Sequence, residues 1–176
     1  MIPAWEILSK CVAQAQDGTK IDMTGEDGST GIIDEHIFAV KVPYTRDQRQ
    51  RFSVTPRPAL VFCAPRRVRC PLEGGDNHKA VVFYDVLAQI LHTSLSIHSD
   101  GTLKNILKWE QSVRRYFHTG NLRNEVFNTS DGMCTLIGVD QVDPFDDRQF
   151  HLFDDCVSAI PISFKVWEPH DTDGRV

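Results

Sequence analysis

The fold of this chain is decided by the stretch from Lys79 to Gly120, which reads KAVVFYDVLAQILHTSLSIHSDGTLKNILKWEQSVRRYFHTG. Its first part, Ala80 to Leu91, is apolar on both alternating faces, with β-branched and aromatic residues crowded at its start. This composition favours a central β-strand over an edge strand. A short apolar run is also compatible with a helix, so the helical alternative stays open. We predict a long buried strand here.

After residues 92–100 the apolar residues recur at helical spacing. Asp100 or Thr102 can accept hydrogen bonds from the first-turn amides, and basic residues lie near the negative end before Gly120. The predicted helix therefore covers the sheet with one apolar face. The residues of that face are Leu103, Ile106, Leu107, Val113 and Phe117, and Lys104, Lys108, Gln111 and Arg115 lie mostly on the other side.

A second amphipathic helix is predicted at the N-terminus. Pro3 occupies the favoured first helical position, and Asp17-Gly18 ends the element. Its predicted apolar stripe consists of Trp5, Leu8, Val12 and Ala15. Residues 22–30, rich in glycine and acidic side chains, are expected to form a flexible loop, and residues 169–176 a frayed C-terminal tail.

The remaining apolar segments alternate as strands do. They lie at residues 32–42, 59–63, 123–128, 134–139 and 160–166, with 123–128 and 134–139 forming a hairpin turned by residues 130–132. Residues 65–77 form a long charged hairpin arm that leads into the central strand. We predict an α+β fold for the single domain 1–176: a mainly antiparallel twisted sheet with two helices packed on it.

The composition fits one globular domain. The chain has 176 residues, of which 41% are hydrophobic, and a net charge of −5. No apolar run is long enough to cross a bilayer, and the N-terminus lacks the features of a secretion signal, so we expect a soluble protein made in a cytoplasm. The five cysteines are odd in number and irregularly spaced, which argues against a disulfide framework.

The sequence contains none of the common catalytic or nucleotide-binding motifs. Two alternatives remain open: a metal site at Cys63, Cys70 and His78, and a catalytic pair of Cys63 or Cys134 with a histidine. The acidic run from Asp140 to Asp155 lacks the ligand order of a calcium loop, and a solvated loop is the simpler interpretation. We predict no catalytic residue, metal or cofactor.

Charge is segregated along the chain. Residues 41–69 carry eight basic side chains and one aspartate, a net +7, whereas residues 140–155 carry six aspartates and one arginine, a net −5. Such segregation favours head-to-tail contact between copies, in which a basic segment meets the next copy's acidic one. Two solvated segments, or arginines that face nucleic acid, are the alternatives. The predicted contact residues are Arg49, Arg51, Arg66, Arg67, Arg69, Asp143, Asp146, Asp147, Asp154 and Asp155.

The order of these elements resembles that of the tail terminator, or minor tail completion, proteins of long-tailed bacteriophages. The resemblance covers most of the chain from Ala59 onward and includes the helix LKWEQSVRRYF, residues 107–117, and the closing strand VSAIPISFKV, residues 157–166. It implies a structural, non-enzymatic protein that forms a ring, typically of six copies. Such a ring caps the tail tube, ends its polymerisation and docks it to the neck (connector) of the virion.

The resemblance also implies the partners: other copies of the chain, the tail tube protein, the neck protein, and genomic DNA that passes without specific binding. The aspartates of residues 140–155 suit either a lumen that must not hold DNA or the seam between copies. A small cytoplasmic enzyme with a cysteine or histidine site and a nucleic-acid-binding module are the competing interpretations.

Overall fold

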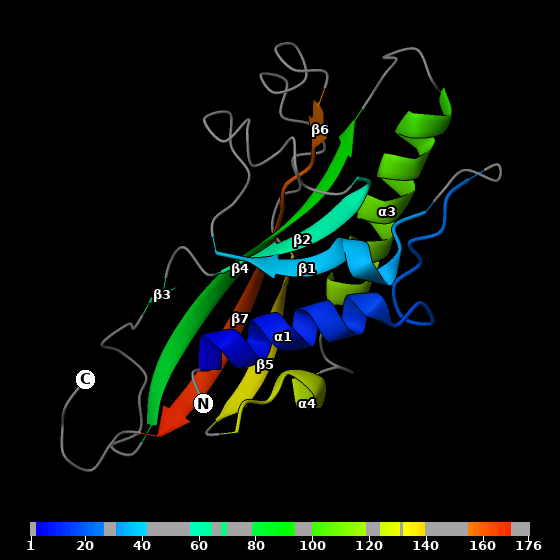
Figure 1. Ribbon diagram of the computed structural model, residues 1–176. Coiled ribbons are helices and arrows are strands. Elements are labelled where there is room, and N and C mark those ends of the chain that lie inside the picture. The colour runs from blue at the N-terminus through cyan, green and yellow to red at the C-terminus, as the bar shows by residue number, and fades with distance from the viewer. Residues whose placement is uncertain are drawn as a thin grey trace.

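The computed structural model describes residues 3–26, 31–41, 57–64, 68–69, 79–93, 100–118, 124–130, 132–139 and 155–169. Its helices are α1 (Pro3–Gln16), α3 (Asp100–His118) and α4 (Asn124–Phe127), with a 3₁₀ turn, η1, at Asp34–His36. Its strands are β1 (Ile37–Val40), β2 (Ala59–Cys63), β3 (Val68–Arg69), β4 (Lys79–Thr93), β5 (Met133–Val139), β6 (Asp155–Val157) and β7 (Ile160–Pro169). The described part of the chain is therefore a mixed α+β fold, as predicted (Figure 1).

The sheet is built around β4, which the sequence predicts as its central strand. Five strands follow one another in the order β1-β2-β4-β7-β5, and the short strands β3 and β6 also pair with β4 (Figure 1). Every described pairing is antiparallel except that of β1 with β2, which is parallel. The mainly antiparallel sheet is thus confirmed, with one parallel edge that the sequence did not indicate.

The helices lie on one face of the sheet, which we call the near face (Figure 1). Alternate residues of the strands, such as Phe62, Val86 and Phe164, pack with helix residues such as Ile7 and Trp109 in one buried cluster. Aromatic rings dominate its centre: Phe117 lies 6.1 Å from Phe62 and 5.9 Å from Phe127 between ring centroids. This cluster holds both helices to the sheet by removing apolar area from water.

Both helices are where the sequence predicts them, but each buried stripe is rotated from the predicted one. In α1 the buried apolar residues are Ile7, Leu8, Cys11 and Ala15, and Trp5 is 55% exposed. In α3 the predicted Leu103 and Leu107 are exposed, and the buried stripe instead contains Asn105, Ile106, Trp109, Glu110, Val113, Tyr116 and Phe117. The rotation follows the large rings, since Trp109 and Phe117 bury more area than the leucines do.

The hairpin predicted from residues 123–128 and 134–139 is wrong in its first half. Residues Asn124–Phe127 form the short helix α4, and β5 pairs with β7. Phe127 is fully buried against Phe164, with ring centroids 5.1 Å apart, and the Asn128 side chain accepts a hydrogen bond from the Cys134 amide at 2.8 Å. A turn of helix places Phe127 in the core while Asn128 stabilises the start of β5.

The first predicted strand, residues 32–42, is shorter than expected. The turn η1 precedes it, so that the described strand is only Ile37–Val40. In β5, a bulge between Leu136 and Gly138 places Gly138 at φ +141°, a conformation that favours glycine. Most of the predicted arm, 65–77, lies outside the described residues, as do residues 27–30 of the predicted flexible loop and 170–176 of the predicted tail.

Candidate intersubunit surfaces

Of the ten predicted contact residues, only Arg69 and Asp155 fall within described strands, where their backbone is placed. Arg69 is opposite Phe83 of β4, and Asp155 is opposite Thr93 of the same strand. The other eight lie outside the described residues: Arg49, Arg51, Arg66, Arg67, Asp143, Asp146, Asp147 and Asp154. The structure therefore gives the backbone position of these two residues only.

Arg69 and Asp155 are placed at two separate points along β4. Phe83 and Thr93 are ten residues apart, which corresponds to about 33 Å along a strand. They also lie on opposite edges: Phe83 pairs with both β3 and β7, and Leu91 pairs with both β2 and β6. Hence β3 shares an edge of β4 with β2, whereas β6 shares the other edge with β7 (Figure 1).

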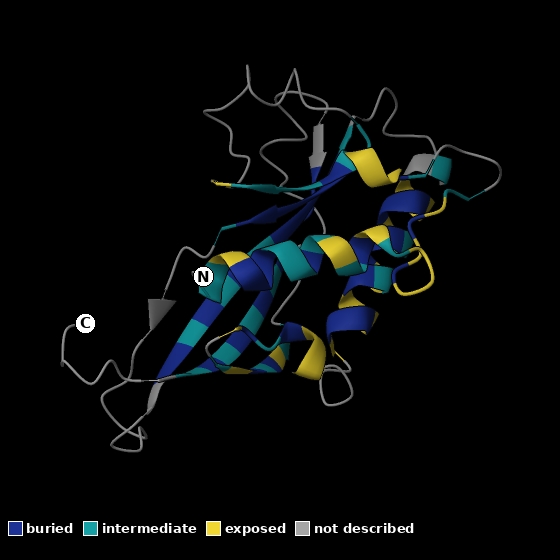
Figure 2. Ribbon diagram, turned by 60° about the horizontal axis from the view of Figure 1, so that its bottom comes forward, coloured by how far each residue is buried: buried dark blue, intermediate teal, exposed yellow. Residues whose placement is uncertain are grey.

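The sheet face opposite the helices, which we call the far face, has two different halves. Near β6 the residues of this face are buried. Ala59, Val61, Cys63, Leu91 and Val157 form a second buried cluster there, separate from the near-face core. Toward β3 and the start of β5 the far face is half-buried and mixed in character. Figure 2 shows buried and intermediate residues alternating along the strands, as expected when one face is covered more completely than the other.

The half-buried part of the far face combines apolar and polar groups on β5 and β7. Met133 and Ile137 of β5 are 60% and 55% exposed. The Lys165 ammonium lies 4.6 Å from the centroid of the Trp167 ring, and the Ser163 hydroxyl donates to Asp85 at 2.8 Å. An exposed apolar pair on an edge strand, next to a cation and an aromatic ring, has the composition of an interaction surface.

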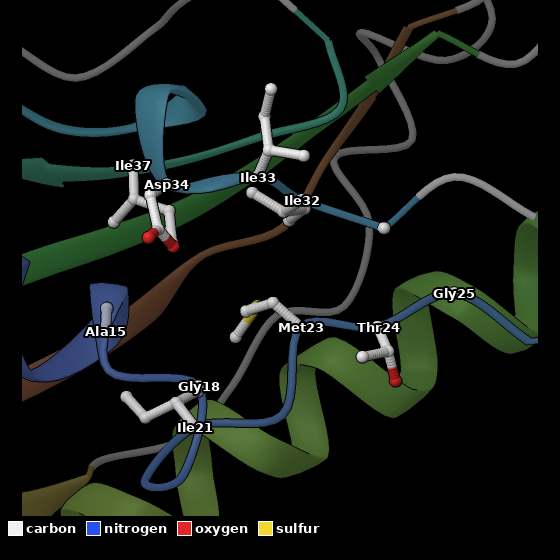
Figure 3. A pocket seen from close by; sticks show the side chains of 11 residues that line it. Ala15, Gly18, Ile21, Met23, Thr24, Gly25, Ile32, Ile33, Asp34 and Ile37 are labelled. Carbon is white, nitrogen blue, oxygen red and sulfur yellow. The ribbon is translucent and has the colours of Figure 1, made fainter.

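A pocket of about 400 Å³ opens between the end of α1, the following loop and the residues leading into β1 (Figure 3). Its floor is apolar, with Ile21, Met23, Ile32 and Ile37 each at most 6% exposed. At its rim lie Ile33, which is 47% exposed, and the carboxylate of Asp34. The pocket is therefore a hydrophobic hollow with a negative charge at its edge.

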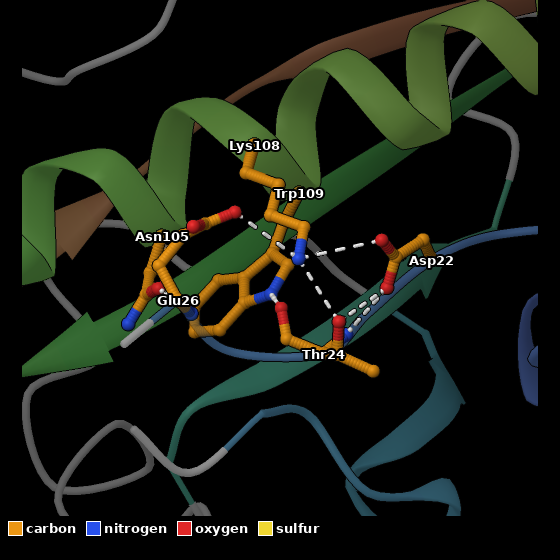
Figure 4. Close-up of polar contacts among 6 residues, drawn as sticks. All are labelled: Asp22, Thr24, Glu26, Asn105, Lys108 and Trp109. Carbon is orange, nitrogen blue, oxygen red and sulfur yellow. Dashed lines mark hydrogen bonds and ion pairs between the residues drawn. The ribbon is translucent and has the colours of Figure 1, made fainter. Parts of the chain in front are cut away.

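One wall of this pocket is held to α3 by a set of polar contacts that we call the Lys108 clamp (Figure 4). The Lys108 ammonium lies 3.3 Å from both Asp22 and Glu26 and donates to the Thr24 hydroxyl at 2.9 Å. The Trp109 indole donates to the Thr24 carbonyl at 2.9 Å, and the Glu26 amide donates to the Asn105 side chain at 2.7 Å. Residues 22–26 are thus anchored by five contacts that sequence periodicity gave no means of finding.

Glu110 is an unexpected buried acid on α3. It is only 7% exposed, and one of its carboxylate oxygens has no hydrogen-bond partner. Removal from water raises the pKa of Glu110 to about 7, against the opposing effect of Arg114 one turn later. The apolar stripe predicted for this helix does not include Glu110, and the observed rotation of α3 buries it.

Three of the described cysteines are buried thiols. Cys11, Cys63 and Cys134 are each inaccessible to solvent, and Cys63 donates to Gln89 at 3.5 Å. Burial raises the pKa of Cys11 well above its usual range and that of Cys134 to about 12. These two thiols are therefore protonated at neutral pH and poor nucleophiles.

Two of the described histidines make separate contacts, and His118 at the end of α3 is exposed. His36 lies 3.0 Å from the Pro58 carbonyl through Nδ1, and the His92 ring stacks on Trp109 with centroids 6.0 Å apart. Within the described residues no group of three or more His, Cys, Asp or Glu side chains could hold a metal ion. Cys70 and His78, proposed with Cys63 as ligands, lie outside them.

Among the helices that the structure describes, none combines the length and the apolar character needed to cross a bilayer. The sequence matches no protein-family model, and no curated protein matches it significantly.

Proposed function

We propose that this chain is a structural subunit that forms a ring of six copies at the end of a bacteriophage tail tube, where it ends polymerisation and joins the tail to the neck of the virion. The supporting observation is that Arg69 lies opposite Phe83 and Asp155 lies opposite Thr93, ten residues apart along β4 and on its opposite edges. A head-to-tail contact uses two different patches of the same molecule, so that both remain available in every copy.

In this proposal the long charged arm, residues 65–77, carries Arg66, Arg67 and Arg69 to the next copy's acidic segment, residues 140–155. The backbone positions of Arg69 and Asp155 are about 33 Å apart along β4, roughly four Debye lengths at physiological salt, so the attraction between these two residues within one copy is strongly screened. The attraction is then directed to a neighbour. Repetition of one such contact by a constant rotation closes a ring.

The seam is tested with two charge-reversed variants. Variant A carries Arg66→Glu, Arg67→Glu and Arg69→Glu, and variant B carries Asp146→Lys, Asp147→Lys and Asp155→Lys. Each alone is expected to lose ring formation, because like charges then meet at every seam. An equimolar mixture is expected to recover rings in which A and B alternate, which requires an even copy number.

The measurements are electron microscopy for ring closure and sedimentation for particle mass, on purified protein and on virus particles that contain it. A control variant with Lys104→Glu and Arg115→Glu, on the solvent side of α3, carries reversed charge away from the seam and should still form rings. Normal rings from A or B alone, or no ring from the wild-type chain in any of these preparations, would refute the proposal.

A further inference from the structure

The pocket beside α1 is preformed. The Lys108 clamp holds its Met23–Gly25 wall, and the Ile32 amide donates to the Met23 carbonyl at 2.9 Å. Gln16 at the end of α1 donates to the carbonyls of Asp34 and Ile37, each at 3.1 Å. A preformed hollow binds more tightly than one that must be ordered on binding.

The backbone of this wall lies in direct contact with the backbone at Gly31. A Cβ atom on Gly31 would lie 2.4 Å from the Met23 carbonyl oxygen, so that only glycine lets these two segments approach. The pocket therefore depends on the local sequence in detail.

The chemistry of the pocket defines what it can accept. A volume of about 400 Å³ is at the small end of ligand pockets and suits one large apolar side chain. Asp34 and Glu35 lie exposed at and beside the rim, and neither forms an ion pair with another described residue. The matching ligand is an aromatic or aliphatic side chain with positive charge on its flank.

The chain itself contains such a sequence. Within the basic segment 41–69, net charge +7, the run Arg49-Gln50-Arg51-Phe52 places an aromatic residue directly after two arginines. We propose that the pocket receives Phe52 of a second copy, with that copy's Arg49 and Arg51 against Asp34 and Glu35. This inference rests on the proposed ring and adds a second contact to its seam: an apolar anchor with complementary charges around it.

The inference is tested by crosslinking from position 52. Phe52 is replaced by the photoreactive p-benzoylphenylalanine, this chain is mixed with an excess of ¹⁵N-labelled wild-type chain at high concentration, and the irradiated mixture is analysed by mass spectrometry. The expected product joins the unlabelled residue 52 to labelled residues 15–25 or 31–37. Crosslinks confined to one chain, to other surfaces, or absent altogether would overturn the inference.

Self-association measured by sedimentation provides the second test. Phe52→Ala, and separately Asp34→Lys with Glu35→Lys, are expected to weaken association at least tenfold. Tyr44→Ala, a matched aromatic deletion in the same basic segment, should leave association unchanged. A chain that combines Asp34→Lys and Glu35→Lys with Arg49→Glu and Arg51→Glu should regain self-association, which would support the charge pairing. If Phe52→Ala and the Asp34→Lys, Glu35→Lys variant both associate like wild type, the proposed contact is wrong.

The two proposals fail in different ways. If variants A and B assemble only as a mixture while Phe52→Ala assembles like wild type, the ring stands and the pocket contact is wrong. If Phe52 crosslinks to the neighbouring pocket but no closed ring forms, the contact stands and the proposed function is wrong.

Discussion

The near and far faces of the sheet differ in what they bury. On the near face, α1 and α3 pack on alternate strand residues in one continuous core with Trp109, Phe117 and Phe164 at its centre. On the far face, a small cluster around Val61 and Leu91 is dry at one end, and Met133 and Ile137 are exposed at the other. The same strands therefore serve stability through one set of residues and present a surface through the other.

This difference explains why charge and exposure are better guides to function here than the core is. A buried apolar cluster restricts side-chain shape but not partner choice. The surfaces that we propose for recognition lie outside this core: the far face, the pocket beside α1, and the strands β3 and β6, which contain Arg69 and Asp155. The comparison predicts that near-face substitutions change stability first, whereas substitutions in these surfaces change association first.

The largest effect is expected for Trp109→Ala on α3. Trp109 is fully buried on the near face, and its indole donates to Thr24, so its removal leaves a cavity and an unpaired carbonyl. We expect a loss of about 3–5 kcal/mol in the free energy of unfolding, measured by urea denaturation. Trp167→Ala, in the half-buried part of the far face, should cost about 1 kcal/mol or less. Equal losses would contradict the distinction between the faces.

The next effect concerns Glu110, the buried acid of α3. Because burial raises its pKa from the model-peptide value of 4.5 to about 7, the folded state favours the neutral acid. Wild-type stability should therefore fall, relative to Glu110→Gln, as the pH rises from 4.5 through 7, and the difference should vanish below pH 4.5. At pH 8 the variant is expected to be more stable by up to about 3 kcal/mol, with solvent screening reducing this value.

Glu6 provides a control of opposite sign. The hydroxyl and amide of Ser130 donate to its carboxylate at 2.5 and 2.6 Å, and these bonds lower the pKa of Glu6. Its stabilising contribution is present above pH 4.5 and lost as the pH falls through its lowered pKa. Thermal unfolding of Glu6→Gln should thus show a destabilised protein at pH 7 that converges with wild type in acid. Parallel pH profiles for both variants would contradict these assignments.

Much of the fold follows from short-range patterns in the sequence. The runs Ala59–Cys63 and Lys79–Thr93 are β-rich and apolar, and the structure confirms both strands. Pro3 and Gly18 bracket α1 because the first favours a helix start and the second favours its end. Periodicity was less reliable in choosing the buried face: it placed Trp5 inside, whereas tertiary packing buries Ile7 and leaves Trp5 exposed.

The candidate surfaces were harder to predict because they depend on long-range contacts. Lys108 meets Asp22 and Glu26 across more than eighty residues of sequence, and no local pattern joins them. The sequence predicts a strand where α4 forms because Val126 and Phe127 favour β structure, whereas in the structure a turn of helix buries Phe127. Charge segregation could be found from sequence alone, since it requires only counting.

The smallest effect on stability is expected on the far face of β5. Met133 and Ile137 are 60% and 55% exposed, so the double variant Met133→Ser with Ile137→Ser should change the free energy of unfolding by about 0.5 kcal/mol or less. Leu136, between them in sequence, is 2% exposed on the near face. Its replacement by alanine should cost about 2–5 kcal/mol and serves as the matched control on the same strand.

The double variant also separates stability from association on that face. If the exposed pair contacts a neighbour, sedimentation should show weaker self-association at unchanged stability, because surface apolar groups stabilise a complex only when it forms. If the double variant loses as much free energy of unfolding as Leu136→Ala, the far face of β5 belongs to the folding core. The distinction between the two faces then does not apply to this strand. Unchanged stability with unchanged association would restrict the seam to the charged segments and the pocket.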